Sequence, residues 1–127
     1  MFSLSNKPVV AYLAYEPYGI TYLEQFLDNY KKFNSGYDHE LLICFKSFKN
    51  IENITHWKNV INKRSINFVD YTDIQEKSDF DINSYLRIAK DYVDRHILFL
   101  NTYTKPNCNN WLKIFINHYK NKIIIGA

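Results

Sequence analysis

Two patterns of hydrophobic and polar residues alternate along the chain. The first is a short, nearly continuous apolar run rich in β-branched and aromatic residues, which is typical of a strand buried on both faces of a sheet. The run V-V-A-Y-L-A-Y, bounded by Pro8 and Pro17, is the clearest example. By this pattern the sequence predicts strands at residues 9–15, 40–45, 65–69, 96–100 and 122–125.

The second pattern places apolar residues at helical spacing between these runs. It predicts amphipathic helices over residues 20–33, 51–61, 82–93 and 107–119. Asp81 comes just before the third of them, where its carboxylate would accept N–H groups of the first turn as a helix cap. Because amphipathic helices bury their apolar side, the third helix should bury the stripe formed by Ile82, Tyr85, Leu86, Ala89, Tyr92 and Val93.

Regular alternation of strand and helix determines the predicted fold class. Strands that follow one another through helices join a mostly parallel sheet by right-handed crossovers, with helices on both faces. The sequence therefore predicts an α/β three-layer sandwich with a mostly parallel central sheet. The 127 residues fall within the usual size of one domain, so residues 1–127 are expected to form a single domain.

The net charge and the cysteines restrict which classes of partner and which cellular compartment can be expected. The net charge is +3, but the Lys and Arg residues are spread from Lys7 to Lys122 rather than gathered on one stripe, which disfavours a nucleic-acid partner. Cys44 and Cys108 are isolated thiols, as in a reducing compartment. The chain begins without a signal-peptide pattern, and no window approaches the ~20 apolar residues of a membrane span. We expect a cytoplasmic protein without a transmembrane segment.

Polar residues at the predicted strand ends are the candidates for a site. In a parallel sheet these ends share one edge, where ligands bind. The edge would hold an aromatic ring for a base, carboxylates for ribose hydroxyls and an ammonium for phosphate; alternatively, polar residues simply gather where strands meet solvent. Neither a dinucleotide fingerprint nor a P-loop is present, and the four His residues have no metal-ligand spacing. The candidates are Tyr15, Glu16, Lys46, Asp70, Asn101, Thr102 and Tyr103.

The order of motifs resembles the nucleotide-binding half of GT-A fold glycosyltransferases, particularly bacterial family-two-like enzymes. The first strand, turn and helix, V-V-A-Y-L-A-Y-E-P-Y-G, match the start of that family. D-I-N-S-Y at residues 81–85 matches the helix that opens before its metal-site strand. I-L-F-L-N-T-Y-T at residues 97–104 and P-N-C-N-N-W-L at residues 106–112 match that strand and the helix after it. The resemblance covers nearly the whole chain in order.

The resemblance implies a Rossmann-like site for a nucleotide diphosphate sugar. Ala14, Tyr15 and Glu16 would hold the nucleobase and ribose. Lys46 is expected near phosphate from its place at a predicted strand end, not from the resemblance. Nucleoside contacts would come from Asp70, Asp81 and Tyr85. The implied acceptor is a glycan or lipid-linked molecule of a surface polysaccharide or lipopolysaccharide, so the chain would work in the cytoplasm or peripherally at the inner face of the membrane.

Two departures from the family pattern leave alternatives open. Asn101-Thr102-Tyr103 stands at the D-x-D position, and amide and phenol oxygens are weaker ligands than carboxylates for Mn²⁺ or Mg²⁺, the implied cofactors. The sequence also ends where the family's first half ends, so a truncated domain without the acceptor half is expected. The alternatives are a non-catalytic binding or interaction module of this fold and an unrelated flavodoxin-like or receiver domain.

Overall fold

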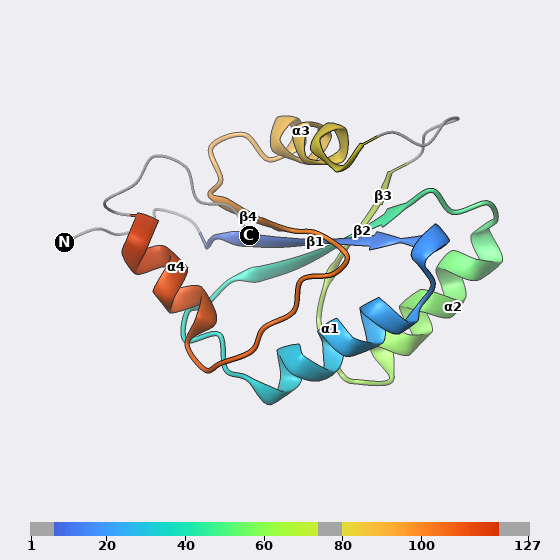
Figure 1. Ribbon diagram of the computed structural model, residues 1–127. Helices are drawn as coiled ribbons and strands as arrows, with labels where there is room; N and C mark the ends of the chain where they lie inside the picture. The colour runs from blue at the N-terminus through green and yellow to red at the C-terminus, as the bar shows by residue number, and fades with distance from the viewer. Residues whose placement is uncertain (1–6, 74–79, 120–127) are drawn as a thin grey trace.

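The computed structural model describes residues 7–73 and 80–119 (Figure 1). Strands and helices alternate through this part of the chain, with a short 3₁₀ turn, η1, after the first strand. In order the elements are β1 (Val9–Tyr15), η1 (Glu16–Tyr18), α1 (Thr21–Lys32), β2 (Glu40–Lys46), α2 (Ile51–Asn62), β3 (Val69–Asp73), α3 (Asp81–Asp91), β4 (Ile97–Leu100) and α4 (Trp111–Tyr119).

The strands form one parallel sheet in the order β3-β2-β1-β4. β1 pairs with β2 along its whole length, from Val9 opposite Glu40 to Tyr15 opposite Lys46. On its other side β1 pairs with β4. This confirms the predicted α/β fold class. It also excludes the flavodoxin-like alternative, in which β1 lies between β2 and β3.

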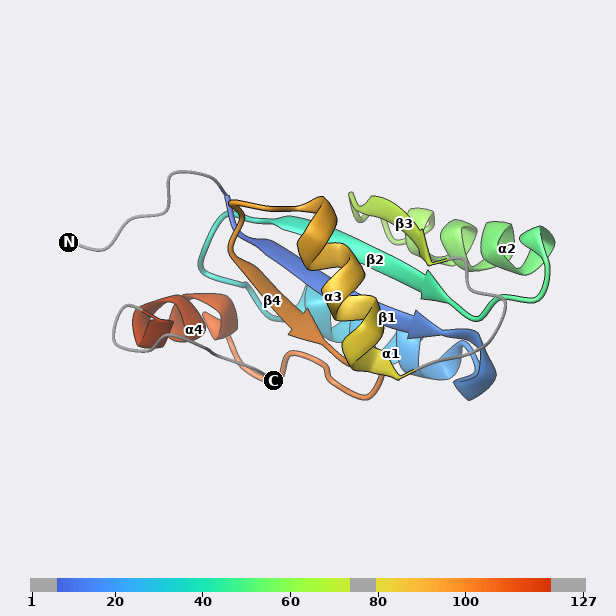
Figure 2. The ribbon, with the colours of Figure 1, turned by 90° about the horizontal axis from the view of Figure 1, so that it is seen from above.

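Helices cover both faces of the sheet. α1, α2 and α4 lie on one face and α3 lies on the other (Figures 1 and 2). The connections from β1 through β2 to β3 step in one direction, whereas the connection from β3 to β4 crosses back over β2 and β1. Because such crossovers are right-handed, the reversal puts α3 on the opposite face.

The core has two parts because successive strand residues point to opposite faces. On β1, Tyr12 faces α1 and stacks on Phe26, with ring centroids 4.0 Å apart and an interplanar angle of 17°. Leu13 faces α3, where Ile88 completes a smaller cluster with Leu42 and Cys44. The continuous apolar runs of β1 and β2 are therefore explained by helices on both faces.

β3 is displaced from its predicted position. The prediction was residues 65–69, whereas the paired strand is Val69–Asp73. Ser65 has a φ of 56°, in the left-handed region that interrupts a strand. Ile66 and Phe68 still pack against the α1-side core, so their alternating pattern reflects a packed loop. The predicted strand at 122–125 lies outside the described residues.

The buried face of α3 also differs from the prediction. Ser84 and Ile88 are buried, while Ile82, Leu86, Ala89 and Val93 are exposed. Tyr85 and Tyr92 lie between these extremes. The helix is turned so that Ser84 and Arg87 reach a buried polar network under its first turns. None of the helices in the described part of the chain is long and apolar enough to cross a membrane.

Candidate functional site

The strand order creates a switch point between β1 and β4. The chain leaves β1 towards β2 on one side, while β4 is added on the other side. In open α/β sheets ligands bind in the crevice outside the carboxyl ends of the strands at such a point. Here Tyr15 and Glu16 follow β1, and Asn101–Tyr103 follows β4. The structure thus brings together two of the segments that the sequence placed at the site.

Two buried hydrogen bonds hold these segments side by side. The Tyr12 hydroxyl donates to the carbonyl oxygen of Thr102 at 2.6 Å. The Thr102 hydroxyl donates to the carbonyl oxygen of Leu13 at 2.8 Å. Burial raises the pKa of Tyr12 far above its ordinary value, so the phenol stays protonated and remains a donor. The loop after β4 is therefore fixed to the end of β1.

The Tyr12–Thr102 hydrogen bond is expected to matter for stability. Tyr12→Phe leaves the buried Thr102 carbonyl oxygen without this donor, which should lower the free energy of unfolding by about 1–3 kcal/mol. The matched control is Tyr71→Phe, which removes an exposed hydrogen bond to Asp91 and should cost less than about 1 kcal/mol. Urea denaturation followed by circular dichroism measures both. Equal losses would contradict the role assigned to Tyr12.

Asn101 forms its own turn. Its amide oxygen accepts hydrogen bonds from the Tyr103 backbone N–H at 3.0 Å and the Thr104 hydroxyl at 2.8 Å. A hard cation at this position would have to compete with both donors for a neutral oxygen. Within residues 7–73 and 80–119, no group of three or more His, Cys, Asp and Glu side chains could hold a metal. The donor set does not fit Mn²⁺ or Mg²⁺.

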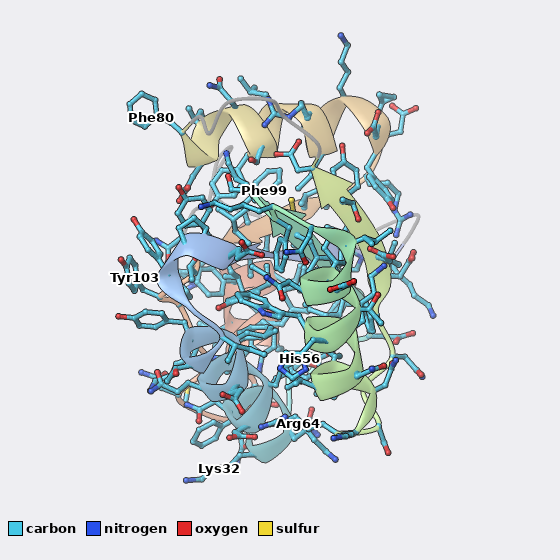
Figure 3. The ribbon with its side chains drawn as sticks, turned by 90° about the vertical axis from the view of Figure 1, so that its right-hand side faces the viewer. Lys32, His56, Arg64, Phe80, Phe99 and Tyr103 are labelled. Carbon is cyan, nitrogen blue, oxygen red and sulfur yellow. The ribbon has the colours of Figure 1, made fainter. Side chains whose placement is uncertain are left out.

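Tyrosines gather beside the switch point; we call Tyr15, Tyr18, Tyr22 and Tyr103 the tyrosine cluster. Tyr18 contacts Tyr15 edge-on at 4.8 Å between ring centroids and stacks on Tyr103 at 5.2 Å. Tyr22 contacts Tyr103 edge-on at 4.8 Å. A hydrogen bond with Tyr18 raises the pKa of Tyr103. In Figure 3, which faces the carboxyl ends of the strands, Tyr103 points away from the body of the molecule.

Lys46 belongs to a buried polar network with Asp73, Ser84 and Arg87. Lys46 is 1% exposed, and its ammonium donates to the Ser84 hydroxyl at 2.6 Å and to the Phe80 carbonyl oxygen at 3.1 Å. Ser84 in turn donates to Asp73 Oδ2 at 2.7 Å. Arg87 donates to both oxygens of Asp73, each at 2.7 Å. The network joins the ends of β2 and β3 to the first turns of α3, so the Lys46 ammonium faces the helix instead of the solvent.

Asp73 is the carboxylate of this network, and its pKa is lowered. Burial by itself raises the pKa of an aspartic acid, but the hydrogen bonds from Arg87 and Ser84 and the charges of Arg87 and Lys46 outweigh it. Asp73 is therefore ionised at neutral pH. Burial chiefly raises the pKa of the nearby Cys44 thiol to about 12, so that group stays neutral.

Two predicted site residues present no side chain at the switch point. Asp70 is the second residue of β3, paired in register with Ile43, instead of the residue that ends the strand. It is exposed and forms an ion pair with Lys58 of α2. Ala14 lies at the end of β1, but its side chain is buried in the core on the α1 face. Only the backbone of Ala14 is left for a ligand.

The remaining predicted residues lie in different settings. The Glu16 carboxylate accepts hydrogen bonds from the Lys49 N–H and the Asn53 side chain, at 3.4 and 3.3 Å. Asp81 is exposed inside the first turn of α3, so the predicted cap is wrong: Phe80 is the N-cap residue, without a side-chain bond. Tyr85 stacks on Phe99 of β4 at 4.6 Å, and burial chiefly raises its pKa to about 12.

Sequence reasoning missed several residues of this region. Tyr18 and Tyr22 follow Tyr15 at spacings of three and seven residues, a helix-like recurrence that could have grouped them. Asp73 was missed because the strand was predicted too early. Ser84 and Arg87 carry a weaker signal, since an i, i+3 polar pair on a helix is usually a solvated surface.

Comparisons of the chain with protein-family models, with curated proteins and with solved structures found no match. Function is therefore inferred from the residues and the geometry of the site.

Proposed function

We propose that this chain is a GT-A-like domain that binds a nucleotide diphosphate sugar at the β1–β4 switch point. Its role would be transfer of the sugar to a glycan or lipid-linked acceptor of a surface polysaccharide or lipopolysaccharide. The single observation that carries the proposal is the switch point itself. Tyr15 and Glu16 lie opposite Asn101–Tyr103 at the carboxyl edge of a parallel sheet with the order β3-β2-β1-β4.

The residues of the crevice suit the parts of such a ligand. The Tyr15 ring would stack on the nucleobase, since an aromatic face binds any base with useful energy. Glu16 and Asp81 would accept hydrogen bonds from ribose hydroxyls or base N–H groups. The amino end of α3 lies over the carboxyl ends of β1 and β4 (Figure 2). Its partial positive charge would favour a diphosphate at this edge.

The residues at the β1–β4 switch point are better suited to binding a nucleotide sugar than to its metal-assisted transfer. The family's D-x-D carboxylates would position a divalent ion at the diphosphate, but here the Asn101 oxygen is held by its own turn. This favours a second candidate, a module of the same fold that binds the nucleotide without catalysing transfer. The two candidates differ in whether the bound nucleotide sugar is consumed.

Calorimetric titration of UDP, GDP and CDP into the purified chain, with and without Mn²⁺, tests the donor site. We expect saturable binding of one nucleotide, with little change on adding Mn²⁺. Tyr15→Ala should weaken the binding about 5- to 150-fold, by roughly 1–3 kcal/mol of lost stacking, whereas Tyr15→Phe should keep most of the affinity. If none of the three nucleotides binds, the proposal is wrong.

Release of nucleoside diphosphate separates the two candidates. The nucleotide that binds is supplied as its sugar conjugates, alone and with oligosaccharide acceptors, and the free diphosphate is measured. Release that requires an acceptor supports a transferase. Tight binding with no release supports the non-catalytic module.

A further inference from the structure

Three members of the tyrosine cluster form an open aromatic surface. Tyr18, Tyr22 and Tyr103 are 48%, 36% and 56% exposed, respectively. They come from η1, α1 and the loop after β4, so the fold assembles them from separate segments. Mutual ring contacts hold the three side chains together. We call this surface the tyrosine platform.

The chemistry of the tyrosine platform selects a neutral, hydroxylated ligand. Tyr18 and Tyr103 stack on each other, but both side chains remain about half exposed. The exposed parts of the rings attract weakly positive C–H groups, and the phenols can donate and accept hydrogen bonds at the rim. The cation–π contacts of the described residues lie elsewhere, at Lys32–Phe33 and Lys58–Phe45, so no cation is stacked on the platform to receive a phosphate. A pyranose ring has this combination, with C–H groups on its faces and hydroxyls around its edge.

The tyrosine platform also lies where an acceptor sugar would be needed, beside the proposed nucleotide site. Tyr18 contacts Tyr15, the residue that we place against the nucleobase, so the platform adjoins the proposed nucleobase position. The Thr102 hydrogen bonds fix the start of the Asn101–Tyr103 loop, and stacking on Tyr18 holds Tyr103. A sugar resting on the platform would lie next to a donor bound in the crevice, as two reacting groups must. The exposed surface of α3, by contrast, carries the aliphatic Ile82 and Leu86 beside charged side chains, and none of the residues exposed on this helix is aromatic, so it suits a sugar less well.

We propose that the tyrosine platform is a carbohydrate subsite that binds a neutral pyranose of the acceptor glycan, with Tyr103 as its central ring. The assignment to the acceptor rests on the proposed function, whereas binding of carbohydrate does not.

Saturation-transfer NMR of the full chain with neutral oligosaccharides tests the proposal. The panel consists of linear trisaccharides of glucose, galactose, mannose, N-acetylglucosamine and rhamnose. We expect one or more to bind, in the millimolar range typical of a small stacking site (about −4 kcal/mol). Tyr103→Ala should weaken binding at least tenfold, and Tyr103→Phe should retain most of it because the ring remains. Unchanged thermal unfolding of both variants verifies that their folds are intact.

Phe80→Ala is the matched control, because Phe80 is also an exposed aromatic residue, 81% exposed, and points away from the body in Figure 3. It should leave sugar binding unchanged; a loss as large as that of Tyr103→Ala would overturn the proposal. Failure of the whole panel, or binding indifferent to Tyr103→Ala, would also overturn it. A proline-rich peptide or zwitterionic lipid vesicles bound through Tyr103, with no sugar bound, would assign the surface to that partner instead.

Nucleotide titration of the same preparations separates the two proposals. If a nucleotide binds and no sugar does, the platform assignment is wrong and the proposed function stands. If a sugar binds through Tyr103 and no nucleotide does, the carbohydrate subsite stands and the nucleotide-sugar function fails.

Discussion

Asp73→Ala is expected to lower the free energy of unfolding by about 3–5 kcal/mol, since Asp73 is buried and removing one partner of a buried ion pair is strongly destabilising. Asp73 accepts hydrogen bonds from both Ser84 and Arg87, and its charge also faces the buried Lys46. Without the carboxylate, two cations remain close together at the start of α3. The loss of stability should also affect the loops after β1 and β4, because the network anchors the first turns of α3 beside these loops.

Asp70→Ala is the matched control for Asp73→Ala. Both residues lie on β3, but Asp70 is exposed and its ion pair with Lys58 is at the surface. Exposed pairs contribute about 0–1 kcal/mol, so this variant should be nearly as stable as the wild type. Urea denaturation at neutral pH measures both variants. Similar losses for the two would show that the Asp73 network contributes no more than a surface pair.

The stability contributed by Asp73 should also depend on pH. Its folded-state pKa is lowered, whereas in the unfolded chain it titrates near the ordinary value of about 3.9. A group with a lowered folded pKa contributes its full stability above the unfolded pKa, and loses it as the pH falls through the folded pKa. Wild-type stability should thus decline below about pH 4, and Asp73→Ala should lack this share of the decline. An identical acid profile for the variant would contradict the assignment.

Ile88→Ala is expected to destabilise the protein by about 2–5 kcal/mol, the usual cost of emptying a buried aliphatic site. Ile88 is buried against β1 and β2 and is the only α3 residue in the smaller buried core cluster of the described residues. Leu86→Ala, two residues away on the same helix, should change stability by less than about 0.5 kcal/mol because Leu86 is exposed. Comparing the two variants tests the orientation of α3. If the stripe predicted from the sequence faced the core, Leu86→Ala would cost more stability than Ile88→Ala. Thermal and urea unfolding measure both.

Hydrophobic periodicity predicted most of the elements because it is a local property of the chain. β1, α1 and β2 lie close to their predicted ranges, since their apolar runs and stripes each match one buried environment. The meeting of Tyr15–Glu16 with Asn101–Tyr103 could also be predicted, because parallel strands bring their carboxyl ends to one edge. The position of Asp81 beside that edge follows from the same reasoning.

The local hydrophobic pattern did not predict the position of an element correctly where polar residues pair with partners far away in the sequence. β3 was predicted too early because S-I-N-F-V has a better strand pattern than V-D-Y-T-D, yet Asp73 must stand beside Lys46 at the end of the sheet. α3 was predicted with its most apolar stripe inward, yet Ser84 and Arg87 must face Asp73.

The sequence by itself determined the α/β class, the parallel sheet and the edge at which a site would lie. Each follows from periodicity and from the handedness of crossovers. Only the tertiary structure decided that Lys46 is buried under α3, that Asp70 lies away from the edge, and that Tyr18, Tyr22 and Tyr103 share one surface. These outcomes depend on pairing charges and rings from distant segments, and no local pattern records which distant partner a side chain will meet.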